Sequence, residues 1–406
     1  MMLPTVYDFL LTLTADGEQF RVSSSCPGLA GEVTEPHSVP ADVLDRITNR
    51  AVELQWHNSD GDLYGRVAAK DRAGGAQQPD STAEAAGGAS RMSKSRWGTF
   101  GEAAELGYEL YNAVFGPHHH QSFQQALHAA RHERATLRLL IQYPPTAVAA
   151  HETPWELLCD GRTGFLAVCP DTLLARYLLQ PRAQGRLRVD GRVRVLCSTA
   201  CPKGEEPLEV EREARDIEAV ARATLREDDE WYWYPLAKTS RDFLLQALVR
   251  AEVRETPFHV WHHASHGEVE RGTGKFHLLL EDRDGTRQEV PATDLAHAIR
   301  QECPDLRVAV LNVCSSGSFR GLATSLAELN IPAVVGHAVK VPDDSALVFS
   351  RALYARLFHW PVDWAVRKAR RALFLRGRLD WAWTLLFLRT RDGTLLAPHS
   401  QETVDD

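Results

Sequence analysis

Short apolar runs alternate with amphipathic stretches through the second half of the chain. Near-continuous apolar runs, typical of strands that helices cover on both faces, stand at 192–199, 258–265, 306–313, 331–339 and 383–389. Between them, apolar residues recur at helical spacing in 207–224, 240–250, 293–302, 321–330, 344–358 and 362–375. Strands that alternate with helices of this length predict βαβ units, and hence an α/β fold with a mostly parallel sheet flanked by helices.

Local signals refine this pattern at a few positions. Ser240 and Thr293 stand where helix N-caps are expected, and Asp284-Gly285 predicts the turn of a hairpin over 276–292. The basic run 367–378 has helical spacing, so its charges are expected on a solvated face.

The first half mixes strands and helices in a less regular order. Strands are expected at 7–13, 20–22 and 135–143, and helices at 40–54, 100–115 and 123–133. The stretch 151–168 predicts a strand-turn-strand with Asp160-Gly161 as its turn. Together these elements predict an α+β extension that precedes the regular α/β half.

Residues 68–95 have a different composition. Ala, Gly, Ser and Gln dominate, and large apolar residues are nearly absent. Such a segment cannot bury enough surface to offset the entropy lost on ordering it. We expect a flexible loop here; the alternative is a regulatory loop that a partner protein binds or cleaves.

Composition and charge narrow the class of protein. The 406 residues are 44% hydrophobic and 25% charged, as in an ordinary soluble globular protein. The net charge of -8 disfavours non-specific binding to nucleic acid or to an anionic membrane. No run of eighteen apolar residues predicts a membrane helix. Seven widely spaced cysteines fit a reducing compartment, so we expect a cytoplasmic protein.

Two predicted strands end on residues with reactive side chains. His266 follows the run 258–265, and Cys314 follows the run 306–313. In open α/β sheets, sites form beyond the carboxyl ends of the strands, so neighbouring strands would bring this pair together. An imidazole stabilises a thiolate nucleophile and returns a proton to the leaving amine. Gly267, which has no Cβ, lets its N–H approach a substrate, and the N–H groups of Gly267 and Cys314 are candidate oxyanion donors.

These motifs resemble a known family. "SHG" at 265–267 and "NVCSSG" at 312–317 are similar to the caspase-like clan of cysteine peptidases, and the 48-residue spacing is close to that of caspases. The fuller pattern resembles the bacterial CHAT branch of that clan over roughly residues 100 to 390. The further matching segments are "WELL" at 155–158, "VEREARDIEAV" at 210–220, the stretch 331–357 and "DWAWTLLFLR" at 380–389.

The resemblance implies a division of the chain and a catalytic pair. Pattern and composition give an N-terminal α+β segment at 1–67 and the flexible loop at 68–95, and the resemblance adds a pseudo-N-terminal part of the CHAT region at 96–185, a caspase-like catalytic core at 186–392 and a tail at 393–406. It places the catalytic pair on His266 and Cys314. It also implies that a backbone carbonyl, rather than a third acid, orients the histidine, so Glu268 is assigned to the rim of the site.

The residue that receives the substrate side chain is left open. In arginine- or lysine-cutting branches of the clan, an acid often stands two residues before the nucleophile, and here that position is Asn312. Asp343 and Asp344 follow the run 331–339 and are the other candidates for the substrate-binding pocket. A buried pocket acid selects a cation, because an unpaired charge there is costly. A basic residue and a small apolar residue both remain open for the position before the cleaved bond.

The function implied is a cysteine endopeptidase that acts on protein or peptide substrates, with no cofactor. The resemblance also implies a bacterial defence or cell-death effector that a sensor or regulatory protein activates. Two alternatives stay open, a catalytically weak scaffold or interaction module and a thiol hydrolase of small molecules. A metal site on His262, His263 and His266 is disfavoured, because cysteine and carboxylate ligands at suitable spacing are missing.

Overall fold

The computed structural model describes residues 5–29, 31–58, 100–178, 187–188, 193–225, 231–270, 272–318, 320–390 and 393–397. The segment 68–95, for which a flexible or regulatory loop is predicted, lies outside these residues, as does most of the tail. The helices are α1 (Ala41–Asn58), α3 (Gly101–His132), α4 (Val148–Glu152), α5 (Val210–Thr224), α6 (Arg241–Val253), α7 (Ala292–Glu302), α8 (Leu322–Glu328), α9 (Asp343–Leu357) and α10 (Val362–Phe374).

The strands of the first half are β1 (Val6–Asp16), β2 (Gln19–Cys26), β3 (Gly31–Pro40), β4 (Thr136–Tyr143) and β5 (Thr172–Leu178). Those of the second half are β6 (Leu187–Arg188), β7 (Val193–Thr199), β8 (Trp231–Leu236), β9 (Val260–Val269), β10 (Phe276–Glu281), β11 (Arg287–Pro291), β12 (Val308–Val313), β13 (Ala333–His337), β14 (Thr384–Leu388) and β15 (Leu396–Ala397). Two short 3-10 helices, η3 (Trp155–Leu157) and η4 (Leu379–Trp383), complete the described elements.

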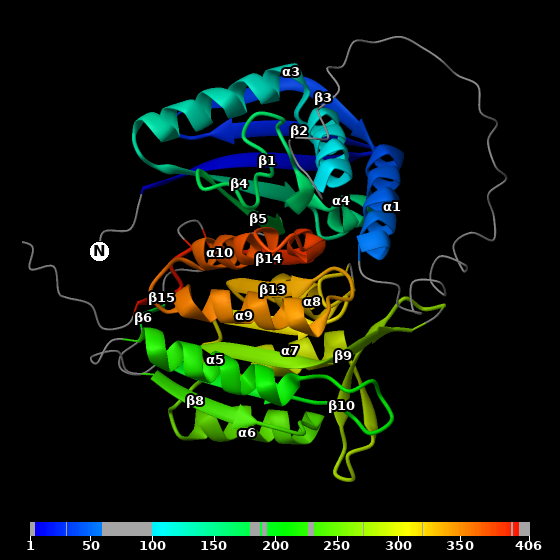
Figure 1. The fold of residues 1–406 in the computed structure, drawn as a ribbon, viewed down its shortest axis with the longest axis vertical. Coiled ribbons are helices and arrows are strands. Elements are labelled where there is room, and N and C mark those ends of the chain that lie inside the picture. Colours follow the sequence, from blue (N-terminus) through cyan, green and yellow to red (C-terminus); the bar gives the residue numbers. More distant parts are fainter. Residues whose placement is uncertain are drawn as a thin grey trace, which may run out of the picture.

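One mixed sheet of 13 strands runs through both halves of the described chain (Figure 1). Its order is β11-β10-β9-β12-β13-β14-β5-β4-β1-β2-β3. Outside this order, β7 pairs with β9, and β8 pairs with β7. The pairs β7–β8, β7–β9, β9–β12, β12–β13, β14–β5, β4–β5 and β1–β4 are parallel. The α/β class with a mostly parallel sheet flanked by helices is therefore confirmed.

Helices cover the sheet because its strands are apolar on both faces. Every described side chain of β13 and β14 is buried. On the near face in Figure 1, α5 packs on α9 and α9 packs on α10, while α6, α7 and α8 form a second row of contacts. None of the described helices is long and apolar enough to cross a membrane.

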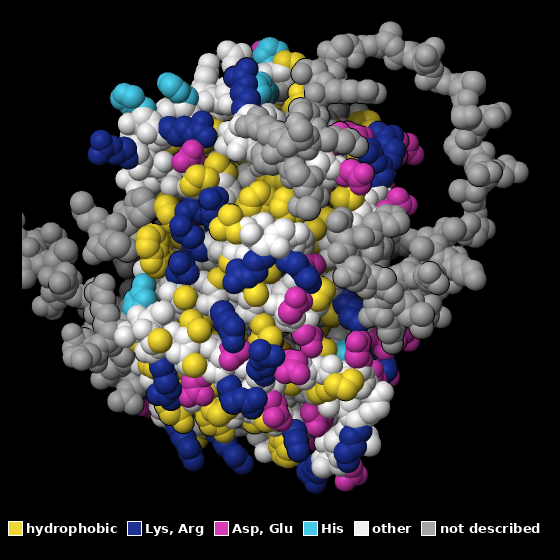
Figure 2. Space-filling view, viewed as in Figure 1, with side chains coloured by type: hydrophobic (Ala, Val, Ile, Leu, Met, Phe, Trp, Pro, Cys, Tyr) yellow, Lys and Arg dark blue, Asp and Glu magenta, His cyan; other side chains and the backbone are white. Residues whose placement is uncertain are grey.

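The face shown in Figure 2 carries both signs of charge side by side. Arginines of α5 pair with acids one turn away, as in the Arg222–Glu218 pair at 2.7 Å. Arg351 of α9 reaches across to Asp216 of α5 at 2.6 Å. These interspersed pairs leave no large region of one sign over α5 and α9.

Buried ion pairs join the first half of the sheet to the second. Glu156, fully buried in η3, binds Arg176 of β5 at 2.7 Å and Arg370 of α10 at 3.2 Å. Arg138 of β4 similarly binds Asp8 of β1 at 2.6 Å and Asp363 of α10 at 3.1 Å. The expectation that the run 367–378 is solvated is wrong for part of it, because Arg370 turns inward to Glu156 and is 1% exposed.

Two local predictions are wrong. The stretch 151–168 makes no hairpin: its start is helical, and only Cys159 and Phe165 form a bridge. The turn itself exists, because Asp160 Oδ1 accepts hydrogen bonds from the N–H groups of residues 162–164. Thr293 lies inside α7, whose N-cap is Pro291, whereas Ser240 does cap α6 by accepting from the N–H of Phe243.

Candidate active site

Neighbouring parallel strands bring His266 and Cys314 to one edge of the sheet. β9 and β12 run side by side, and Ser265 pairs with Val313 at the end of their shared register. His266 and Cys314 are the next residue on each chain segment, and both side chains are half-buried. Residues 48 positions apart in sequence are therefore adjacent at the carboxyl end of the parallel ladder.

The sequence pattern predicts that the strand ends before His266, but β9 does not end there. It continues to Val269 and exchanges partners at this point. His266 pairs with Leu279 and Gly267 pairs with Leu278 of the antiparallel strand β10. The imidazole is thus carried by a paired strand, which restricts its movement more than a loop would.

A backbone carbonyl orients the imidazole of His266. Its Nε2 lies 2.7 Å from the carbonyl oxygen of Glu206. A carbonyl oxygen only accepts hydrogen bonds, so Nε2 carries the proton and Nδ1 of the neutral ring keeps its lone pair. Nδ1 is then the ring atom that is free to accept a proton.

The loop that carries Glu206 connects β7 to α5 and is held by ion pairs. Lys340 Nζ lies 2.8 Å from the carboxylate of Glu206. Arg287 of β11 lies 3.1 Å from Glu205 and also binds Glu268 of β9. Glu268 is therefore paired at the edge of the site, and the residues around Glu206 fix the carbonyl that His266 uses.

Cys314 sits at a sharp turn after β12. The next residue, Ser315, has a φ of 57°, a strained value for a residue with a Cβ. Burial raises the pKa of the Cys314 thiol, and the charges of Asp343 and Glu206 act in the same direction. A hydrogen bond with the backbone of Val341 and the charge of Lys340 oppose this increase. In this conformation the group is a thiol, so nucleophilic attack requires transfer of its proton.

His151 links the first half of the sheet to the loop after Cys314. Its Nε2–H donates to the carbonyl of Gly317 at 3.1 Å and lies 3.2 Å from Thr324 Oγ1. The ring is buried and stacks on Phe387 of β14. Burial lowers the pKa of His151 to about 3, so the ring is neutral and acts as a fixed hydrogen-bond donor.

Gly267 is packed against the backbone of Cys314. A Cβ at this position would meet the ring of Phe276 first, and would lie 2.7 Å from Val313 Cγ1 and 2.8 Å from the Cys314 carbonyl oxygen. No side chain fits there without a shift of the strand or of its neighbours. The backbone of Gly267 therefore lies close to that of Cys314.

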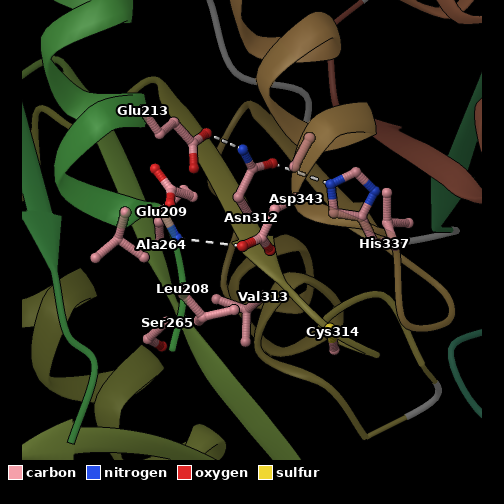
Figure 3. Close-up of a pocket in the computed structure, with 13 residues that line it drawn as sticks. Leu208, Glu209, Glu213, Ala264, Ser265, Asn312, Val313, Cys314, His337 and Asp343 are labelled. Atoms are coloured by element: carbon pink, nitrogen blue, oxygen red, sulfur yellow. Dashed lines mark hydrogen bonds between the residues drawn. The ribbon is translucent and has the colours of Figure 1, made fainter. Parts of the chain in front are cut away.

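A cavity opens beside Cys314, as Figure 3 shows. Asn312 and Asp343 line it together with Cys314, whereas Asp344 does not. The side chain of Asp344 is 71% exposed and pairs with Arg378 at 3.1 Å. Of the three candidates for substrate binding, the structure therefore places Asn312 and Asp343 in the wall of the cavity that Cys314 also lines, and Asp344 outside it.

The cavity also contains an acid that sequence reasoning missed. Glu213 of α5 is 5% exposed, and its Oε1 accepts from Asn312 Nδ2 and, at 2.8 Å, from Ser350 Oγ. A signal was present, because the buried face of α5 consists of Val210, Glu213, Ile217 and Ala221. An acid at an inward-facing position of an amphipathic helix indicates a buried polar contact.

The two buried histidines that precede His266 on β9 have structural contacts. His263 lies 2.8 Å from Ser198 Oγ and 2.9 Å from Ser265 Oγ, and His262 lies 3.4 Å from Glu213. Within the described ranges, no group of three or more His, Cys, Asp or Glu side chains is arranged to hold a metal ion.

One family of known proteins matches most of the chain. The model of the CHAT domain family matches residues 104–389. A chain of the Saccharomyces cerevisiae separase–securin complex is 13% identical with a TM-score of 0.44, over 94% of this chain and 30% of that one. This chain therefore spans less than a third of the length of that chain. No curated protein matches the sequence significantly.

Proposed function

This chain belongs to the CHAT domain family, whose model spans more than half of it, and from that premise we propose that it is a cysteine endopeptidase that cleaves protein substrates. Cys314 is the proposed nucleophile and His266 the proposed acid–base. The observation that carries the proposal is the hydrogen bond of His266 Nε2 to the Glu206 carbonyl, beside a cysteine at the adjacent strand end. That bond leaves Nδ1 as the proton acceptor.

The proposed reaction uses these groups in two steps. The thiol proton moves to His266 Nδ1 while sulfur attacks the peptide carbonyl, and the N–H groups of Gly267 and Cys314 bind the oxyanion. The imidazolium then protonates the amine as the C–N bond breaks, which leaves a thioester on Cys314. Water, deprotonated by the same imidazole, hydrolyses the thioester and restores the thiol.

We extend the proposal to a regulated role in bacterial defence or cell death, in the cytoplasm and under the control of a partner protein. The raised pKa of Cys314 and its bond to the Val341 backbone support a resting state that activation must change. The same observation favours the alternative of a scaffold with weak catalysis. Covalent labelling separates the two.

A peptide acyloxymethyl ketone is expected to label Cys314 in the wild-type protein. The His266→Ala variant is expected to react at least about 100-fold more slowly, because general acid–base catalysis contributes on this scale. Mass spectrometry of the labelled tryptic peptide measures both rates. As a control, His297→Ala removes an exposed histidine of α7 and is expected to react like the wild type. Labelling that does not depend on His266 contradicts the dyad, and absence of labelling and of peptide cleavage under every activating condition favours the scaffold.

The Gly267→Ala variant is expected to lose roughly 100-fold in turnover. The new methyl group would clash with the ring of Phe276, with Val313 and with the Cys314 carbonyl oxygen, and an ångström of misplacement at a reacting centre costs a factor of this size. Initial rates on a fluorogenic peptide measure the loss. Val269→Ala, an exposed position of the same strand, is the control and should keep wild-type rates. Wild-type turnover in Gly267→Ala would show that this close approach does not position the nucleophile.

A further inference from the structure

The cavity beside Cys314 is acidic. Among the described residues that line it, Glu209, Glu213 and Asp343 carry carboxylates and none is a lysine or arginine. The histidine in its wall, His337, is neutral, because burial lowers its pKa to about 4. The other lining side chains are uncharged, and most are apolar. We refer to this space as the acidic cavity.

Glu213 presents an oxygen without a partner to the acidic cavity. Its contacts with Asn312, Ser350 and His262 all use Oε1. Within the described ranges, no hydrogen bond or ion pair engages Oε2. Figure 3 shows this second oxygen turned toward the cavity, while the first points to Asn312. A carboxylate that is 95% buried with one unused oxygen favours a ligand that donates a hydrogen bond.

The charges support a cationic ligand. Burial alone would raise the pKa of Glu213, but its contacts with His262, Ser350 and Asn312 lower it, so the group is an anion. Burial and the charge of Glu213 raise the pKa of Asp343. The two carboxylates therefore repel each other, and a cation placed between them would relieve that repulsion.

Asn312, two residues before Cys314, has an amide side chain in place of an acid. This amide holds the carboxylate of Glu213 in place. Asn312 Nδ2 donates to Glu213, and Asn312 Oδ1 accepts from His337 Nε2 at 3.0 Å. β12 has no acid at position 312, and the acid in the cavity, Glu213, comes from α5 instead. Leu208 and Val341 add apolar walls against which a methylene stem packs.

We propose that the acidic cavity binds the side chain of an arginine or lysine at P1, the residue whose carbonyl carbon Cys314 attacks. This inference rests on the proposed function. Glu213 Oε2 is the inner acceptor of the cation, and Asp343 is the outer one. Asp343 Oδ2 already accepts from the N–H of Glu209 at 3.1 Å, which fixes it at the side of the cavity.

The first test compares P1 arginine with P1 citrulline, which has the same shape without the charge. We expect the arginine peptide to be cleaved with a kcat/KM roughly 100-fold higher or more, because a buried acid left without its cation is costly. Glu213→Gln is expected to bring this ratio below about 10. The control Glu211→Gln changes an exposed acid of the same helix and should keep the wild-type ratio. Asp343→Asn, with a smaller expected effect, serves if Glu213→Gln does not fold.

The outcome separates this inference from the proposed function. Cleavage that requires Cys314 but prefers citrulline or an acidic P1 residue overturns the inference and leaves the peptidase proposal intact. Absence of any cleavage and labelling under every activating condition overturns the peptidase proposal instead.

Agmatine, which is decarboxylated arginine and carries the guanidinium on its methylene stem, tests the cavity without catalysis. It is expected to raise the Tm of the wild-type protein and not that of Glu213→Gln, because a ligand that binds only the folded state stabilises it. 1-Pentanol, an uncharged molecule with a similar stem, is expected to give no shift that depends on Glu213. No agmatine-dependent shift in the wild type overturns the acidic cavity as a cation site.

Discussion

The Cys314→Ala variant is expected to lose peptide turnover by about 10⁴-fold or more and to remain folded. Without sulfur no thioester forms, and only binding and oxyanion contacts remain to accelerate hydrolysis. The side chain is half-buried at a strand end, so the change removes one atom from the wall of a cavity and the free energy of unfolding should fall by about 1 kcal/mol at most. Initial rates on a fluorogenic peptide and a urea unfolding curve measure the two effects.

A second cysteine distinguishes loss of the nucleophile from loss of sulfur in general. Cys169 is buried, and its backbone lies in the loop before β5, in the other half of the sheet. Cys169→Ala is expected to keep turnover within about twofold, since it leaves the proposed acyl-transfer groups untouched. Equal loss of turnover in both variants, or a collapsed circular-dichroism spectrum in Cys314→Ala, would contradict the role and placement of Cys314.

The sequence was sufficient to locate the residue pair because parallel sheets impose a simple rule. An apolar run that ends abruptly marks the carboxyl end of a strand, and neighbouring parallel strands end on the same edge. The run before Cys314 obeys this rule, since β12 ends at Val313. The prediction did not require knowledge of the partner change at His266, where β9 continues with β10.

Sequence patterns could not predict the groups that surround His266 and Cys314. Glu206 contributes a backbone carbonyl, which any residue type could supply, so its identity carries no signal. Glu213 and His151 reach the site from distant elements, and helical or strand periodicity does not report which elements pack together. The turn at Asp160 shows a related limit, because a turn signal does not reveal whether the flanking segments pair.

The Glu156→Ala variant is expected to lose about 3–5 kcal/mol of unfolding free energy, the largest stability effect that we predict. Removal of the carboxylate leaves Arg176 and Arg370 buried without their counter-ion, and a buried charge that loses its partner costs this much. Burial already lowers the pKa of Arg370 to about 10, even though Glu156 acts to raise it. Urea unfolding followed by circular dichroism measures the loss. Glu211→Ala, at an exposed position, is the control and is expected to change stability by less than about 0.5 kcal/mol.

The Glu156→Ala variant is also expected to have lower turnover at temperatures well below its Tm. The reason is that hydrogen bonds through His151 connect the Glu156 ion pairs to the loop after Cys314. Arg176 Nη1 donates to the carbonyl of His151 at 2.6 Å, and His151 in turn donates to the carbonyl of Gly317, three residues after Cys314. If Arg176 shifts, the loop that carries Cys314 loses this support. A Glu156→Ala protein as stable as the wild type would show that the two arginine charges are compensated elsewhere. A destabilised variant that keeps wild-type turnover at low temperature would show that the two halves of the sheet are not coupled at the site.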